Sequence, residues 1–222
     1  MELEQNLKNL KNELQPFDCK LIAVSKTYPN DIILKAYNSG QKVFGENKVQ
    51  EGIEKKPQLS AYTFEFHLIG HLQKNKVNKA VATFDWIESL DGIELARKID
   101  QACQLLDKVI PVLIQVNLGK EGTKSGVAGE DVLPLVNQIA GFQHLSIRGL
   151  MTLPPFFENP QDVRPYFRRL RELSEQIDRL KIENVGMNEL SMGMSHDYPI
   201  AIEEGATLVR VGTAIFGERP YA

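Results

Sequence analysis

The sequence is poor in the residues that build disulfide frameworks and cysteine-based metal sites. Cys19 and Cys103 are its only cysteines among 222 residues, and no CxxC pair occurs. Two isolated thiols are typical of a reducing compartment and exclude a disulfide scaffold or a cysteine zinc site. We therefore expect a cytoplasmic protein without a structural metal ion.

Long apolar runs and an excess of positive charge are also missing. No stretch is long enough to span a bilayer, and the first residues lack the pattern of a signal peptide. The formal net charge is -3, and Lys74, Lys76 and Lys79 have no aromatic neighbours for base stacking. We therefore expect neither nucleic acid nor membrane as a partner. The absence of a GxGxxG or P-loop motif removes the usual dinucleotide and triphosphate sites.

The chain does contain enough apolar material for a sizeable core, since 42% of its residues are hydrophobic. Near the N-terminus, Leu3, Leu7, Leu10 and Leu14 follow one another at helical spacing with charges between them. This pattern predicts an amphipathic helix over residues 1–15 that packs on the rest of the molecule.

Beyond this helix, buried strands and helices are predicted to alternate. The apolar segments typical of strands are 20–26, 42–45, 64–70, 84–89, 109–118, 145–151, 188–191 and 207–211. The helical segments between them are 32–38, 46–56, 73–81, 92–106, 129–140, 162–179 and 195–204. Such alternation requires parallel pairing. The predicted fold is an α/β protein, a single-domain (β/α)8 TIM barrel over residues 1–222, with an open doubly wound sheet as the alternative.

A lysine stands at the carboxyl end of the first strand, where barrels bind their ligands. Lys26 follows the apolar run Leu21–Val24, and Tyr28-Pro29 then breaks the strand. A partly desolvated lysine can lose its proton near neutral pH and attack a carbonyl. The alternative is a lysine that reaches solvent or pairs with an acid.

The last two strands are followed by turns suited to a phosphate. Ser191, Gly193 and Ser195 follow one strand, and Gly212-Thr213 follow the next. Serine hydroxyls and the free N–H groups of glycine-rich turns bind anions, and barrels commonly hold phosphate at these positions. We also expect Ser195 to cap the helix after it.

Two further features leave alternatives open. His67 and His71 lie on a strand and its exit rather than on one helix face, so we expect hydrogen-bonded structural histidines rather than metal ligands. Lys124, in a glycine-flanked loop, is either a second reactive amine or a surface charge.

These segments together resemble the pyridoxal-phosphate homeostasis protein family, single-domain relatives of the alanine racemase N-terminal barrel. The resemblance rests on AVSK (23–26), FGEN (44–47), HLIGHLQKNK (67–76), KSG (124–126), RGLM (148–151), LSMGMSHD (190–197) and VRVGTAIFG (209–217). It implies a barrel of the alanine racemase N-terminal type that binds pyridoxal 5'-phosphate (PLP).

The resemblance also implies roles for individual residues. Lys26 would carry PLP as an internal aldimine, and Arg210 would face the pyridine nitrogen. Ser191, Ser195, Gly212 and Thr213 would contact the phosphate. Asn47 and Met151 would line the ring.

The function implied by the resemblance is a carrier and buffer of PLP that maintains PLP and amino- and keto-acid balance without turnover of its own. A guanidinium beside the pyridine nitrogen disfavours its protonation, which weakens carbanion chemistry. The sequence also ends soon after the predicted barrel, so we expect no second domain with an opposing base. We expect a monomer that contacts PLP and, transiently, PLP-dependent enzymes.

Two alternatives remain. One is a weakly active PLP-dependent amino-acid racemase whose opposing base comes from the barrel itself or from a partner chain, with Tyr28, Tyr166, Tyr198 and His196 as the candidates. The other is a phosphate-binding barrel enzyme that forms no imine.

Overall fold

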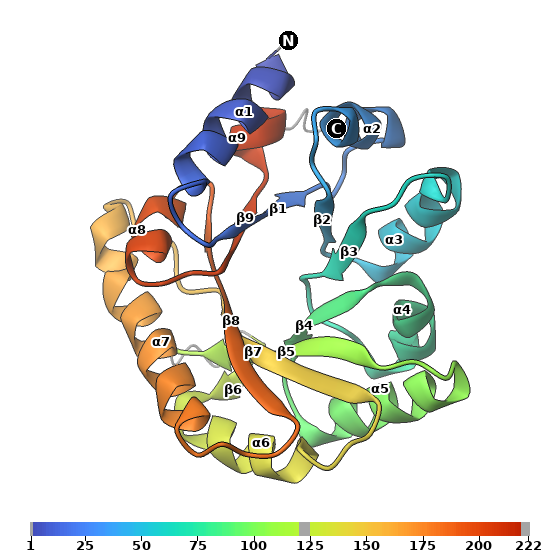
Figure 1. Cartoon of the computed structure of the whole chain (residues 1–222), viewed down its shortest axis with the longest axis vertical. Coiled ribbons are helices and arrows are strands. Elements are labelled where there is room, and N and C mark those ends of the chain that lie inside the picture. Colours follow the sequence, from blue (N-terminus) through green and yellow to red (C-terminus); the bar gives the residue numbers. More distant parts are fainter. Residues whose placement is uncertain (1, 120–124, 219–222) are drawn as a thin grey trace.

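The computed structural model describes residues 2–119 and 125–218, in which strands and helices alternate (Figure 1). The strands are β1 (Lys20–Val24), β2 (Val43–Glu46), β3 (Glu65–Leu68), β4 (Trp86–Leu90), β5 (Ile110–Asn117), β6 (Val127–Ala128), β7 (Leu145–Thr152), β8 (Val185–Met194) and β9 (Leu208–Val211). The α-helices are α1 (Glu2–Leu14), α2 (Asn30–Asn38), α3 (Val49–Lys55), α4 (Val77–Thr83), α5 (Ile93–Leu105), α6 (Val132–Ile139), α7 (Arg164–Asp178), α8 (Tyr198–Glu203) and α9 (Thr213–Phe216). Short 3-10 turns span Lys56–Leu59, Lys74–Lys76, Gly129–Asp131 and Pro160–Val163.

All of the described strands except β6 form a closed parallel barrel. Their hydrogen-bonded order is β4-β3-β2-β1-β9-β8-β7-β5, and the pairing of β4 with β5 closes the ring. The helices lie around the outside of this ring (Figure 1). The predicted (β/α)8 TIM barrel is confirmed, and the open doubly wound alternative is wrong. The pairing of β6 with β5 was not predicted, because two residues are too few to show an apolar pattern.

Alternation along the strands separates two sets of apolar side chains. One set fills the barrel itself, where Ile22, Leu113, Met151 and Leu208 form a cluster of their own. The other set faces outward and joins the helices in a much larger core, to which Phe44 belongs. The interior of the barrel is therefore packed, and a ligand can enter only at one of its ends.

Helix α1 lies on the barrel as expected. Its Leu7, Leu10 and Leu14 are buried, and the Asn6 side chain donates a hydrogen bond to the carbonyl oxygen of Ile215 at 3.2 Å. α1 thereby lies beside α9 from the other end of the chain (Figure 1). Within the described residues, no helix has the length and apolarity to cross a membrane.

Several predicted boundaries are wrong near the carboxyl ends of the strands. The helix predicted from Ser195 begins at Tyr198, and the one predicted from Glu46 begins at Val49. Strand β8 is longer than the predicted 188–191 because it pairs with β7 at one end and with β9 at the other. Pairing with neighbours extends a strand over polar residues that show no strand pattern in the sequence.

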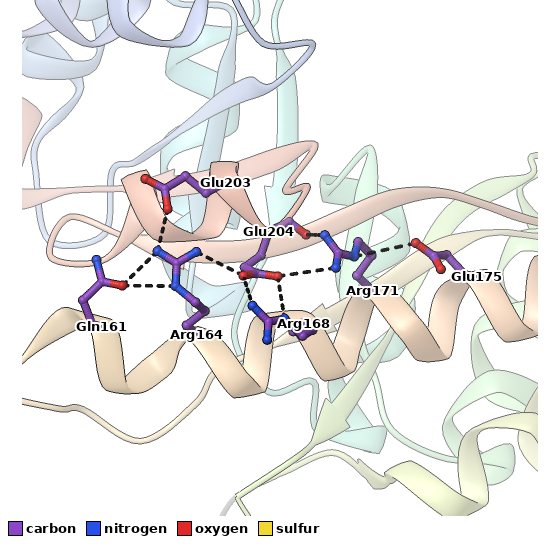
Figure 2. Close-up of polar contacts among 7 residues, drawn as sticks. All are labelled: Gln161, Arg164, Arg168, Arg171, Glu175, Glu203 and Glu204. Atoms are coloured by element: carbon purple, nitrogen blue, oxygen red, sulfur yellow. Dashed lines mark hydrogen bonds and ion pairs between the residues drawn. The ribbon is translucent and has the colours of Figure 1, made fainter.

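An arginine cluster on α7 ties that helix to α8 (Figure 2). The nearly buried carboxylate of Glu204 accepts hydrogen bonds from Arg164 and Arg168, each at 3.0 Å, and Arg171 lies 3.6 Å from it. These contacts lower the pKa of Glu204, chiefly through the hydrogen bond from Arg168. Because α8 directly follows the loop of Ser195, this cluster fixes one end of the segment that carries the loop.

Candidate functional site

A cavity of about 610 Å³ opens at the carboxyl ends of the barrel strands. Its lining includes six of the eight residues predicted to bind the cofactor, namely Lys26, Asn47, Ser195, Arg210, Gly212 and Thr213. The fold thus brings residues from the ends of β1, β2, β8 and β9 around one space. Closure of the barrel places them there although they are far apart in the sequence.

Two predicted residues lie below the cavity rather than on its wall. Met151 and Ser191 are both fully buried, and neither is among the lining residues. Met151 packs inside the barrel against Ile22, Leu113 and Leu208. The Ser191 hydroxyl donates to Glu88 and accepts from Arg210, each at 2.5 Å. Met151 therefore packs beneath the cavity, and Ser191 connects Glu88 and Arg210 there.

The turns after β8 and β9 form a cup at one side of the cavity. The Ser195 hydroxyl accepts hydrogen bonds from the backbone N–H groups of Gly212 (3.2 Å) and Ala214 (3.4 Å). The expectation that Ser195 caps the following helix is wrong, since its hydroxyl reaches across to the start of α9 instead. A Cβ on Gly193, which has a φ of +90°, would lie 2.5 Å from the Cβ of Ala201. Glycine is therefore required there for the loop to pack this closely.

A buried polar network runs beneath Arg210. The guanidinium donates to the Ser191 hydroxyl at 2.5 Å and to the carbonyl oxygen of Thr152 at 2.7 Å. Glu88 accepts the Ser191 hydroxyl through one carboxylate oxygen, and its other oxygen lies 2.6 Å from Nδ1 of His67. This network compensates the charge of an arginine that is only 3% exposed.

The charges of this network shift the pKa values of its members. Burial alone would raise the pKa of Glu88, but the hydrogen bond and charge of His67 and the charge of Arg210 lower it below its ordinary value. Burial alone would lower the pKa of His67, but its contacts with Glu65 and Glu88 raise it overall. Both shifts favour the charged forms, a carboxylate at Glu88 and an imidazolium at His67.

Glu88 was missed as a functional residue by the sequence reasoning. The available signal was a glutamate inside the apolar segment 84–89, where an ionisable side chain is rarely buried without a partner. The prediction that His67 is a hydrogen-bonded structural residue is confirmed. Nδ1 of His71 also has a polar partner, Asp91 at 3.3 Å, but the side chain is 52% exposed and lines the cavity, so its structural role stays a prediction.

The proposed opposing bases are not equally placed. Tyr28 donates to the carbonyl oxygen of Gly217 at 3.0 Å, Tyr166 lies against Phe157, and Tyr198 donates to Glu13 at 2.5 Å. None of these tyrosines is among the residues that line the cavity, whereas His196 is. Lys124 lies outside the described residues.

Comparisons with known proteins agree with this fold and site. Residues 1–220 match the model of the family described as alanine racemase, N-terminal domain. The barrel is therefore one of the alanine racemase N-terminal class. A relative from Aquifex aeolicus named pyridoxal phosphate homeostasis protein is 48% identical over 202 residues, which are 91% of this chain and 88% of the relative.

A protein of the same name from Haemophilus influenzae is 42% identical over 205 residues, 91% of this chain and 86% of its own length. The solved structure of PipY from Synechococcus elongatus with PLP bound has a TM-score of 0.90 and 38% identity, and the match covers 97% of this chain and 100% of that one. The chain belongs to the pyridoxal phosphate homeostasis protein family.

Proposed function

We propose that the chain binds PLP in this cavity, through a covalent link to Lys26, and that it carries and buffers the cofactor without turnover of its own. The observation that carries the proposal is that Lys26 lines the same cavity as the Ser195 and Gly212-Thr213 turns. An aldehyde that also bears a phosphate needs this pair of groups. The related PipY, whose structure has PLP bound, supports the choice of ligand.

Different residues of the cavity contact different parts of PLP. The Lys26 amine and the aldehyde carbon join as C=N with loss of one water molecule. Ser195 and Thr213 offer hydroxyl groups to the phosphate beside Gly212, the N–H groups of Gly212 and Ala214 hold the Ser195 hydroxyl in place, and Asn47 lies beside the ring. Met151 and Ser191 act from below the floor, where Ser191 keeps Arg210 in place. Bound PLP supplies an electron-accepting ring.

Arg210 limits what that ring can do. Its guanidinium is tied to Ser191 and Thr152 and has the Glu88 carboxylate behind it, so the arginine stays charged. A fixed positive charge toward the ring nitrogen disfavours protonation there, because two like charges repel in a buried site. The unprotonated ring is a weaker electron sink, which favours storage over carbanion chemistry.

The names of the relatives support a role in homeostasis of the cofactor pool. We propose that this role extends to the balance of amino and keto acids. We propose transient contact with PLP-dependent enzymes that receive the cofactor. The unpaired thiols Cys19 and Cys103 favour the cytoplasm, and we propose that the chain acts there as a monomer. Gel filtration coupled to light scattering tests the oligomeric state.

A weak amino-acid racemase is the second candidate, and His196 is the observation that favours it. Its ring lines the cavity, and its Nε2 lies 3.2 Å from the carbonyl oxygen of Phe157. Incubation with L-alanine or L-serine, followed by chiral chromatography, separates the two functions. We expect no racemisation above that of free PLP, and a higher rate that is lost in His196→Ala would establish the racemase.

The deciding experiment for covalent binding is borohydride reduction of the PLP-loaded protein followed by peptide mass spectrometry. We expect one modified peptide, at Lys26, and no modification in Lys26→Ala. Lys48→Ala is the matched control, because Lys48 is an exposed lysine at the end of the adjacent strand. Unmodified, colourless protein would support the phosphate-binding enzyme without an imine and contradict our proposal.

A further inference from the structure

The turn that carries Lys26 has an unexpected residue at its third position. The backbone N–H of Tyr28 donates to the carbonyl oxygen of Ser25 at 3.1 Å, which closes a four-residue turn with Lys26 second and Thr27 third. Thr27 has a φ of +69°, in the left-handed region. Type II turns place glycine or asparagine at this position, and a β-branched residue is rare there.

The left-handed conformation of Thr27 needs support from outside the turn. Such a conformation costs on the order of 1–3 kcal/mol in a non-glycine residue and persists only where neighbouring groups impose it. The Thr27 side chain is exposed. Support must therefore come from contacts with the backbone.

Helix α3 supplies these contacts. The Glu51 carboxylate accepts the backbone N–H of Thr27 at 2.8 Å. One turn further along the helix, the Lys55 ammonium donates to the carbonyl oxygen of Ser25 at 2.9 Å, so the two side chains hold the turn at both ends. Lys55 also lies 3.5 Å from Glu51.

A second layer holds Lys55 itself. Its ammonium donates to Glu46 at 2.7 Å, and the same carboxylate oxygen accepts the Ser25 hydroxyl at 2.7 Å. Glu46 is fully buried at the end of β2, next to the end of β1. Charge-assisted bonds of this kind are strong and directional. None of Glu46, Glu51 and Lys55 is among the residues that line the cavity.

We propose that Glu51 and Lys55, named here the α3 clamp, are positioning residues that fix the turn so that Lys26 presents its amine to the cofactor cavity. The inference rests on the proposed covalent binding at Lys26. Without the clamp, the peptide between Lys26 and Thr27 rotates toward the negative φ that threonine prefers. The amine then spends less time in the geometry that attack on an aldehyde requires.

The test compares Glu51→Ala with Glu54→Ala. Glu54 lies on the same helix, but its exposed carboxylate contacts the side chain of Gln50 rather than the turn. Two rates are measured: borohydride-trapped attachment of PLP to Lys26, and hydrogen exchange of the Thr27 amide in protein without cofactor. The second rate reports on the turn independently of the cofactor.

We expect Glu51→Ala to slow attachment about tenfold and to speed Thr27 exchange about tenfold, the factor that corresponds to about 1.4 kcal/mol. Glu54→Ala should match the wild type in both rates. Addition of Thr27→Asn to Glu51→Ala should restore attachment to within about twofold of the wild type, because asparagine enters the left-handed region more readily. A purely structural role for Glu51 predicts no such rescue.

Equal rates in Glu51→Ala and Glu54→Ala would overturn the inference. Absence of modification at Lys26 in the wild type would instead overturn the proposed function, and Thr27 exchange would still decide whether the clamp exists. If Glu51→Ala does not fold, Glu51→Gln replaces it, because glutamine keeps the side-chain volume and weakens the bond to Thr27. Wild-type values for both rates in Glu51→Gln would then count against the clamp.

Discussion

Substitution of Glu88 by glutamine tests whether this carboxylate compensates the charge beneath the cofactor cavity. Glu88 is fully buried between His67 and the Ser191 hydroxyl, which links it to Arg210. Glutamine keeps the volume and one acceptor but removes the negative charge. His67 and Arg210 are then left in a dry interior without their counter-ion, and we expect a large loss of stability.

The size of the effect follows from the burial of the network. Removal of one partner of a buried ion pair costs about 3–5 kcal/mol. Because glutamine retains one hydrogen bond, we expect about 3 kcal/mol for Glu88→Gln. For a domain of this size that corresponds to a fall in Tm of about 6–12 °C. The matched control is Glu94→Gln, a 57% exposed glutamate paired with Arg97, which should change stability by less than about 0.5 kcal/mol.

The pH dependence of stability gives a second signature. The pKa of His67 is raised in the folded protein. Its contribution to the free energy of unfolding is therefore complete below the ordinary histidine pKa of about 6.5 and declines as pH rises through the folded value. The pKa of Glu88 is lowered, so its contribution is present above about 4.3 and is lost as pH falls through its folded value. Because Glu88 helps to raise the pKa of His67, Glu88→Gln should reduce the loss of stability that the wild type shows as pH rises.

The assay is thermal unfolding by circular dichroism between pH 4 and pH 9, with chemical unfolding at neutral pH for the free energy. If Glu88→Gln unfolded at the wild-type temperature with an unchanged pH profile, the charges of Glu88, His67 and Arg210 would not be coupled. The proposed role of the network would then be wrong.

Three further predictions concern the cup and its support. Ser195→Ala removes the acceptor of the Gly212 and Ala214 N–H groups and should weaken PLP binding about tenfold in a spectroscopic titration, whereas the exposed Ser60→Ala should bind normally. Gly193→Ala, at a φ of +90° and with its Cβ 2.5 Å from that of Ala201, should lower stability by at least about 2 kcal/mol in chemical unfolding; a smaller loss would mean that the loop adapts. Glu204→Gln should cost about 1–2 kcal/mol at pH 7, because the arginines around it remain partly solvated. Since the pKa of Glu204 is lowered, this difference should decline as pH falls below about 4.3 and be lost as pH falls through the folded value, and a difference that persists at low pH would contradict an ionic origin.

The sequence by itself determined which segments become strands and which become helices. Apolar runs such as 109–118 and the leucine spacing of 1–15 depend on local periodicity, and periodicity records which side of an element is buried. Strict alternation of the two kinds of element then required parallel strands, whose carboxyl ends share one face. That reasoning is sufficient to place Lys26, Ser195 and Arg210 around one cavity.

Only the tertiary structure decided which side chains meet within that arrangement. The bond between Ser191 and Glu88 joins residues 103 positions apart, and the bond between Ser195 and Gly212 crosses from one turn to the next. Such contacts depend on strand register and on closure of the ring, which local periodicity does not record. For the same reason the sequence did not distinguish Asn47 on the cavity wall from Met151 beneath it, because strand register and barrel closure decide how deep a residue lies.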